Sequence, residues 1–142
     1  MPILVQVSEG LLTLEGGREV VPLVADALLK VHGLTGNSFM TQNIVGHFVE
    51  CPESSSYVGG KSQSLAVIEV KVPSTTFTNA EVKGAFVREV TDIIDRLKEG
   101  VHPRHRTFVN VTYAVDGVWG IGGRAYSNAD IGASIAEAVA GD

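Results

Sequence analysis

Hydrophobic and polar residues alternate along the first strand-like segment of the chain, residues 2–8 (PILVQVS). A period of two is typical of a β-strand with one buried face. The alternation puts Ile3, Val5 and Val7 on the buried side of the strand. Pro2 therefore lies on the opposite face.

The next segment changes to the spacing of an amphipathic helix. Its apolar stripe consists of Val20, Val24, Ala27, Leu28 and Val31. Proline is tolerated in a helix within about the first turn, so Pro22 predicts that the regular helix begins near Arg18 to Val21. Gly33 and Gly36 are expected to close it. Residues 43–50 (NIVGHFVE) then predict a second strand.

The second half of the chain repeats this order of elements. Residues 65–72 (LAVIEVKV) predict a strand, and Thr78 with Glu81 resembles a capping box that opens a helix. This helix is expected to end at Gly100, and residues 108–113 (FVNVTY) predict the next strand. The buried side of the predicted helix carries Val82, Phe86, Val90, Ile93 and Leu97.

Two glycine pairs mark the same point in each half. Gly59-Gly60 and Gly122-Gly123 are 63 residues apart (122 minus 59), and the same shift lays residues 3–5 on residues 66–68. Such self-similarity indicates an internal duplication. We therefore expect a single domain, 1–142, with a first β-α-β unit over about 2–63, a second over about 64–126 and a helical tail over about 127–140.

The tail has its own helical pattern. Ser127 to Asp130 predicts an N-terminal cap, and Ile131, Ile135 and Val139 form an apolar stripe behind it. A stripe of this kind packs against another surface, and a neighbouring subunit is one such surface.

These elements predict an α/β (α+β) fold with a four-stranded, mainly parallel sheet. Right-handed crossovers place both helices on one face of that sheet. The other face, with Leu4, Val67 and Phe108, is then left uncovered. Closed cyclic association is the usual way to cover such a face, so we expect a homotrimer.

Composition narrows the range of functions. The chain has 142 residues, 44% of them hydrophobic and 19% charged, which is typical of one globular domain. The net charge of −5 and the lack of a basic stripe argue against nucleic acid as a partner and favour a small molecule or a protein. The sequence shows neither a signal peptide nor an apolar stretch of membrane-spanning length, so we expect a cytoplasmic protein without membrane contact.

Cysteine and metal chemistry are not indicated. Cys51 is the single cysteine, so an internal disulfide is impossible, and no cluster of metal-ligand residues surrounds it. We expect neither a metal nor a cofactor.

Pro2 carries the clearest chemical possibility. A small residue in second position permits removal of the initiator methionine, which would leave the secondary amine of proline at the terminus. A free α-amino group has a reference pKa of about 7.7–8.0, and an apolar pocket lowers that value. Two other interpretations remain: Pro2 simply starts an edge strand, where its missing N–H costs nothing, or Met1 is retained and the Pro2 nitrogen is an amide.

The whole set of features resembles the tautomerase superfamily over residues 2 to about 127. The features are Pro2 on a first strand, the duplicated β-α-β unit and the closing segment 118–123 (VWGIGG). Residues 117–123 are similar to the Gly-His-Phe-Gly-Ile-Gly-Gly of 4-oxalocrotonate tautomerase (4-OT). The stretches 33–36 (GLTG) and 82–84 (VKG) look more like fused members such as cis-3-chloroacrylic acid dehalogenase.

A further stretch, residues 106–110 (RTFVN), resembles the Arg-Val-Tyr-Ile-Asn of macrophage migration inhibitory factor. The resemblance implies that Pro2 is a general base, and that Phe108 and Asn110 belong to the surface that a neighbouring subunit presents to it. Trp119, in the closing segment, is expected either in the pocket wall or in the core.

The chain departs from the family at its carboxylate-binding arginines, whose places are taken by Leu11 and Phe108. The candidates for anion binding are therefore Arg106, Arg124 and Lys71. Arg106 ranks first, because an arginine fork suits a carboxylate better than a lysine point charge, and Lys71 ranks last, because Glu69 on the same face is expected to neutralise it. By strand alternation, Arg106 shares a face with Phe108, whereas Lys71 lies on the counterpart of the Pro2 face. The catalytic residues of the dehalogenase have no counterpart here, so hydrolytic dehalogenation is not expected.

The function implied by the resemblance is a cofactor-independent tautomerase, an isomerase in which Pro2 moves a proton on an enol, keto or unsaturated carboxylic acid substrate. The same amine could add to an aldehyde or an unsaturated acid, which gives decarboxylase or hydratase activity. A non-catalytic trimeric binding protein of the same fold is the third possibility, because function lies in the site rather than in the fold.

Overall fold

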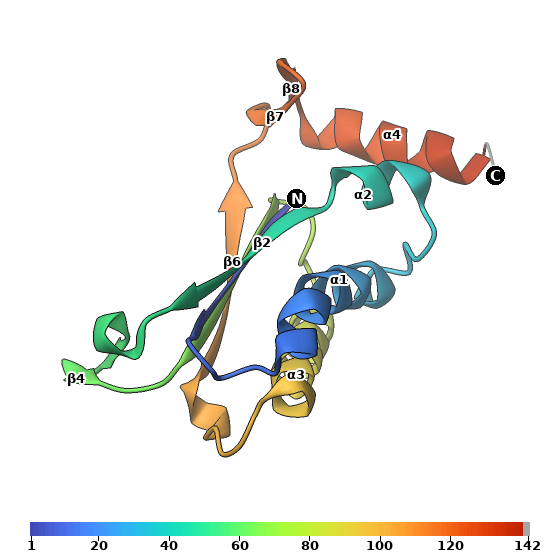
Figure 1. The fold of residues 1–142 in the computed structure, drawn as a ribbon. Helices are drawn as coiled ribbons and strands as arrows, with labels where there is room; N and C mark the ends of the chain where they lie inside the picture. The colour runs from blue at the N-terminus through green and yellow to red at the C-terminus, as the bar shows by residue number, and fades with distance from the viewer. Residues whose placement is uncertain (141–142) are drawn as a thin grey trace.

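The computed structural model describes residues 1–140 (Figure 1). Its strands are β1 (Pro2–Ser8), β2 (Val45–Cys51), β3 (Tyr57–Val58), β4 (Lys61–Ser62), β5 (Ala66–Pro73), β6 (Thr107–Ala114), β7 (Trp119–Ile121) and β8 (Arg124–Tyr126). The α-helices are α1 (Leu14–Val31), α2 (Ser38–Asn43), α3 (Ala80–Leu97) and α4 (Asn128–Ala140), and short 3-10 turns cover Glu53–Ser55 and Arg104–Arg106.

A four-stranded sheet in the order β2-β1-β5-β6 forms the centre of the molecule. β1 pairs in parallel with β2, and β5 in parallel with β6. The two halves meet through β1 and β5, which are antiparallel, with Ile3 opposite Val70. The mainly parallel sheet predicted from the sequence is confirmed. Because β1 and β5 are antiparallel, the strands of one β-α-β unit run in the opposite direction to those of the other.

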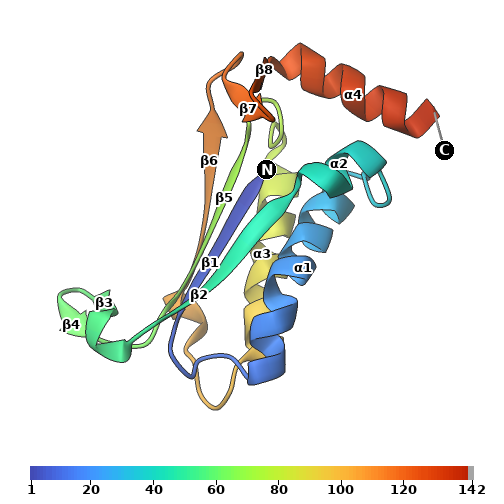
Figure 2. The same cartoon turned by 45° about the horizontal axis from the view of Figure 1, so that its top comes forward.

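Helices α1 and α3 pack side by side on one face of the sheet (Figure 2). The core lies between them and the strands. Among its fully buried side chains are Ile3, Val5, Val20, Val24, Leu28, Ile68, Val70, Phe86, Val90 and Ile94. The opposite surface, which we call the open face, leaves Val45 57% and Phe108 44% exposed.

The start of α1 differs from the prediction. The helix begins at Leu14, where the Thr13 side chain accepts a hydrogen bond from the Gly16 N–H at 2.9 Å, so the expected start near Arg18 to Val21 is wrong. Pro22 lies inside the helix, and its side chain is exposed. The cap and the burial of the apolar stripe offset the hydrogen bond that proline removes.

The start of α3 also needs a correction. Its cap is Asn79 rather than Thr78, because the Asn79 side chain accepts from the backbone N–H of Glu81 at 2.7 Å and of Val82 at 3.4 Å. An asparagine cap uses the same chemistry as threonine one residue later. The helix ends at Leu97, before Gly100.

The tail helix α4 packs on its own chain. Ser127 caps it as predicted, since the Asp130 N–H donates to the Ser127 hydroxyl at 3.1 Å and the Ser127 N–H donates to the Asp130 carboxylate at 2.8 Å. Ile131 is buried, and the Asn37 side chain donates to the Ile135 carbonyl at 3.0 Å. Ile131 and Ile135 of the predicted stripe therefore pack on the chain itself, whereas Val139 is 66% exposed. None of the helices within residues 1–140 is long and apolar enough to cross a membrane.

Candidate active site

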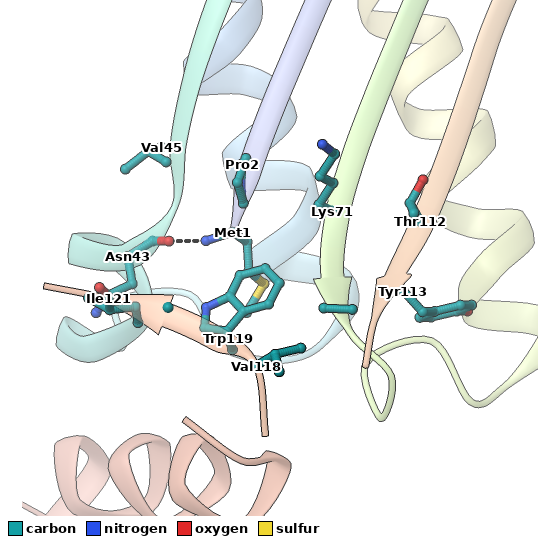
Figure 3. A pocket seen from close by; sticks show the side chains of 12 residues that line it. Met1, Pro2, Asn43, Val45, Lys71, Thr112, Tyr113, Val118, Trp119 and Ile121 are labelled. Carbon is teal, nitrogen blue, oxygen red and sulfur yellow. Dashed lines mark hydrogen bonds between the residues drawn. The ribbon is translucent and has the colours of Figure 1, made fainter. Parts of the chain in front are cut away.

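A cavity of about 430 Å³ lies at the end of the sheet where β1 begins (Figure 3). We call it the Pro2 cavity. Its walls come from the beginning of β1, the end of α2, the ends of β5 and β6, and strand β7. The lining residues are Met1, Pro2, Asn43, Val45, Lys71, Thr112, Tyr113, Ala114, Val118, Trp119, Gly120 and Ile121.

The register of the sheet brings Pro2 and Lys71 together. Pro2 is opposite Val45, and Lys71 is opposite Thr112, while the antiparallel β1–β5 pairing of Ile3 with Val70 aligns the two pairs. Figure 3 shows the resulting row of side chains across the open face, in the order Val45, Pro2, Lys71 and Thr112.

Lys71 supplies the positive charge of this cavity. Among the described residues that line it, Lys71 alone has a charged side chain. Glu69 is on the same face two residues away, yet no ion pair joins Lys71 to any residue within 1–140. The ammonium group is therefore available to an anionic ligand.

Trp119 forms one wall of the Pro2 cavity, where its indole is half-buried. It is held there by the β7–β8 hairpin, in which Trp119 pairs with Tyr126. The hairpin turns through Gly122 and Gly123, whose φ angles of 57° and 84° favour glycine. The backbone of this turn therefore requires Gly122 and Gly123, and the hairpin that they close places Trp119 in the same cavity as Pro2.

The amino group of Met1 is buried next to the Pro2 cavity, and this burial changes its pKa. Met1 is 7% exposed, its amino group donates a hydrogen bond to the Asn43 carbonyl, and its own carbonyl accepts from the Val45 N–H at 3.1 Å. Burial lowers the pKa of the Met1 amino group from 8.0 to about 6, because the cation loses hydration. The Met1 amine is therefore mostly neutral at pH 7.

Asn43 is a site residue that sequence reasoning missed. Its contribution is a backbone carbonyl, and its side chain is engaged elsewhere, donating to the Phe39 carbonyl at 2.8 Å. A backbone acceptor carries no residue-type signal, so the sequence offered none.

Four of the predicted residues do not line the Pro2 cavity of a single chain, and three of them are on or next to β6. Arg106 is in the turn before β6, whereas the β6 residues that line the cavity begin at Thr112, about 20 Å away at the usual rise of about 3.3 Å per strand residue. Phe108 and Asn110 are exposed on the open face, between these two ends. One chain therefore brings Pro2, Lys71 and Trp119 together in the cavity. Arg106, Phe108 and Asn110 of the same chain do not reach it.

Arg124 is likewise outside the cavity. Its guanidinium lies 4.4 Å from the centre of the Tyr126 ring and 3.5 Å from the Asp130 carboxylate. These contacts direct it toward the start of α4 and away from Pro2. Within residues 1–140, no group of three or more His, Cys, Asp or Glu side chains is placed to hold a metal ion.

Solved structures with the same fold place this geometry among known proteins. The chain is similar to a fused 4-OT wild type symmetric trimer, with a TM-score of 0.73 at 14% identity over 93% of this chain and 99% of that one. It is similar to malonate semialdehyde decarboxylase inhibited by 3-bromopropiolate, with a TM-score of 0.65 at 18% identity over 86% and 89%. It is also similar to macrophage migration inhibitory factor of Toxoplasma gondii, with a TM-score of 0.64 at 14% identity over 89% and 100%.

No protein-family model matches this sequence, and no curated protein does. The likeness to solved structures extends along nearly the whole length of each neighbour, so the chain has the fold of the tautomerase superfamily. The resemblance predicted from the sequence is confirmed at this level. Neighbours with this fold include trimers and a decarboxylase.

Proposed function

We propose that the protein is a cofactor-independent tautomerase whose general base is the amine of Pro2, exposed by removal of Met1. The observation that carries the proposal is the surroundings of the chain terminus. Pro2 lines a cavity together with Lys71, and it directly follows the Met1 amino group, whose pKa is lowered by burial to about 6. A base needs to be neutral at working pH, and an acidic substrate needs a positive partner.

The proposed reaction moves one proton. The neutral Pro2 nitrogen takes a proton from the carbon next to the substrate carbonyl, and the electron pair of the broken C–H bond passes into the enolate. The proton then returns from Pro2 to the enolate oxygen, or to a more distant carbon of an unsaturated acid. Atoms and electrons balance without a redox partner.

Lys71 has the role of carboxylate partner in this proposal. A lysine ammonium forms charge-assisted hydrogen bonds with the carboxylate of the bound acid, in the ground state and in the transition state alike. Arg106 was the preferred anion contact from the sequence. Within one chain, Lys71 takes precedence because it shares the cavity with Pro2.

We also propose that the active form is a homotrimer. The exposed apolar side chains of the open face, including Val45, Val49 and Phe108, favour association, and neighbours with this fold are trimers. Association would allow Arg106, Phe108 and Asn110 of one subunit to approach Pro2 of another. Sedimentation should give about three times 15.0 kDa, and a monomer at micromolar concentration would contradict this part of the proposal.

Two measurements test the base itself. The intact mass of the natively expressed protein should lack one methionine, and that protein should convert phenylenolpyruvate to its keto form. A variant with one extra residue before Pro2, which turns the nitrogen into an amide, should fold and bind yet be inactive. Equal activity of the two forms would exclude Pro2 as the base.

A second function is favoured by one observation, the burial of Met1. If the mature protein keeps Met1, its side chain occupies the site, the Pro2 nitrogen is an amide, and the fold serves as a binding protein.

A third option follows from the decarboxylase among the structural neighbours, since a free Pro2 amine can also add to an aldehyde. Assays with phenylenolpyruvate and with a 3-oxo acid distinguish these functions.

A further inference from the structure

Residues 98–106 join α3 to β6 at the end of the molecule opposite α4 (Figure 2). We call this segment the connection. The Glu99 N–H donates to the Leu11 carbonyl at 2.8 Å, which holds the connection to the loop before α1. Arg104 forms ion pairs with two aspartates of α3. The connection is therefore bonded to elements on both sides of it.

His102 is the buried residue of the connection, with 4% of its surface exposed. Its ring Nε2 is 2.9 Å from the hydroxyl of Thr107, the first residue of β6. Its backbone carbonyl accepts from the Lys98 ammonium at 3.4 Å. His102 thus links the end of α3 to the beginning of β6.

The second ring nitrogen of His102 has no partner. Within residues 1–140, its Nδ1 is the one fully buried side-chain nitrogen or oxygen without a hydrogen bond. A neutral imidazole meets this arrangement when its Nε2–H donates to the Thr107 hydroxyl and Nδ1 carries no proton. Protonation would add a buried positive charge and an N–H with no acceptor, both of which are costly. The folded connection therefore favours the neutral ring.

The charged groups that face His102 come from α3 and from the connection itself. Burial is the largest cause that lowers its pKa from 6.5, and Lys98, Arg106 and His105 act in the same direction. The carboxylate of Asp95 opposes them, but it is already paired with Lys98 at 3.1 Å. The electrostatic surroundings therefore resist protonation of the ring.

We propose that His102 makes the connection sensitive to acid: protonation expels the ring from its buried position, which breaks the contact with Thr107 and releases residues 98–106 together with the start of β6. The released segment carries Arg106 and leads directly to Phe108 on the open face. No residue of the connection lines the Pro2 cavity, so the inference does not depend on the proposed function.

The direction of the pH effect follows from the lowered pKa of His102. Above about pH 6.5, the usual value for histidine, the ring is neutral in the closed and in the open connection, and the stabilisation is complete. Below that pH the open connection gains a proton that the closed one does not. Opening should therefore increase by up to about tenfold for each pH unit, until the pH reaches the lowered pKa of the closed form.

The test is amide hydrogen exchange of the intact protein, measured by NMR at pH 7.5 and pH 5.5 and expressed as protection factors. The protection of the Glu99 amide, whose bond to Leu11 closes one side of the connection, should fall about tenfold at the lower pH. Low concentrations of urea should hardly change this exchange, because a local opening exposes little surface. An exchange rate that rises with urea as steeply as that of the Val24 amide in α1 would mean unfolding of the whole molecule and would overturn the proposal.

Two variants assign the effect to His102. His102→Gln cannot gain a charge and still offers an N–H to Thr107, so the protection of the Glu99 amide should become the same at both pH values. His105→Gln is the matched control, because His105 is exposed in the same connection, and it should keep the tenfold drop. Equal protection at both pH values in the wild type, or a drop that persists in His102→Gln, would contradict the inference.

The wild type alone is sufficient if His102→Gln does not fold. The ¹⁵N signals of the His102 ring should report a mostly neutral imidazole at pH 6.5, and the ring should become protonated at the pH at which the Glu99 amide loses protection. A ring that is protonated at pH 6.5 while the Glu99 amide stays protected would overturn the proposal.

Discussion

The two ends of the β1–β5 pair are equivalent in the duplication but differ in chemistry. At one end Pro2 begins β1, and at the other Leu65, 63 residues later, precedes β5. Each end has its own glycine-paired hairpin, β7–β8 beside Pro2 and β3–β4 beside Leu65. Each also has a cavity, of about 430 Å³ at the Pro2 end and about 210 Å³ at the Leu65 end.

The difference lies in what faces the start of each strand. The counterpart of Lys71 under the 63-residue shift is Ser8, which is buried. Its hydroxyl accepts from the Leu65 N–H at 2.9 Å and is 3.3 Å from the Leu65 carbonyl oxygen. The nitrogen at this end is therefore an amide in mid-chain with its hydrogen bond satisfied. The duplication gives each end a pocket, and we propose that removal of Met1 makes the nitrogen at one of them, that of Pro2, a base.

The largest effect is expected from changing Pro2. Pro2→Ala leaves a primary amine of different basicity and geometry, so enol–keto conversion of phenylenolpyruvate should fall by about 10²- to 10⁴-fold, the usual worth of a general base. Leu65→Ala is the matched control at the equivalent strand start and should leave kcat/KM nearly unchanged. Similar losses in both variants would mean that Pro2 supports the fold rather than the reaction.

Removing the positive charge of Lys71, which the Leu65 end lacks, should give the next largest effect on activity. Lys71→Ala removes a charge-assisted contact worth about 1.5–3 kcal/mol, so KM for a carboxylate substrate should rise about ten- to a hundredfold. The neutral ester should be nearly unaffected, and Lys71→Arg should recover part of the loss.

Arg106→Ala, measured in parallel, tests the contribution of a neighbouring subunit. It should raise KM for the acid selectively if Arg106 reaches the partner's site in a trimer. A selective loss with Arg106→Ala and none with Lys71→Ala would reverse the roles that we assign to these two residues.

The two helices allow a smaller test of the same comparison. Pro22 in α1 corresponds to Ala85 in α3, again 63 residues apart. Proline in a helix interior costs about 3 kcal/mol, part of which the native α1 already accommodates. Pro22→Ala should therefore raise the free energy of unfolding in urea by about 1–3 kcal/mol. Ala85→Pro should lower it by at least as much, and a loss of stability in Pro22→Ala would show that α1 depends on the proline.

Much of the fold could be predicted from periodicity alone. The strands around Val5 and Ile68 alternate, and the helices around Val24 and Phe86 have a helical stripe, because each buries one side against the same core. The exceptions are short or locally decided elements. Helix α2 has six residues and β3 and β4 have two each, lengths too short for a period to emerge.

The candidate site could be predicted in part. Pro2 was named from its place behind Met1, Trp119 from the resemblance of the closing segment, and Lys71 from its charge and strand face. The fold brings all three into one cavity. The sequence ranked Arg106 above Lys71, because alternation along one strand does not show which strand ends meet. The contact with the Asn43 carbonyl depends on the position of a backbone atom, which leaves no residue-type signal.

The central claim is that the Pro2 nitrogen is a free amine with a lowered pKa. The most direct measurement is a ¹⁵N NMR titration of the natively expressed protein, labelled with ¹⁵N-proline and compared with Pro2→Ala to assign the signal. We predict a secondary-amine resonance that titrates clearly below the reference pKa of about 7.7–8.0, with kcat/KM falling as the pH drops through the same value because protonation removes the base. An amide resonance that does not change between pH 5 and 9 would contradict the account.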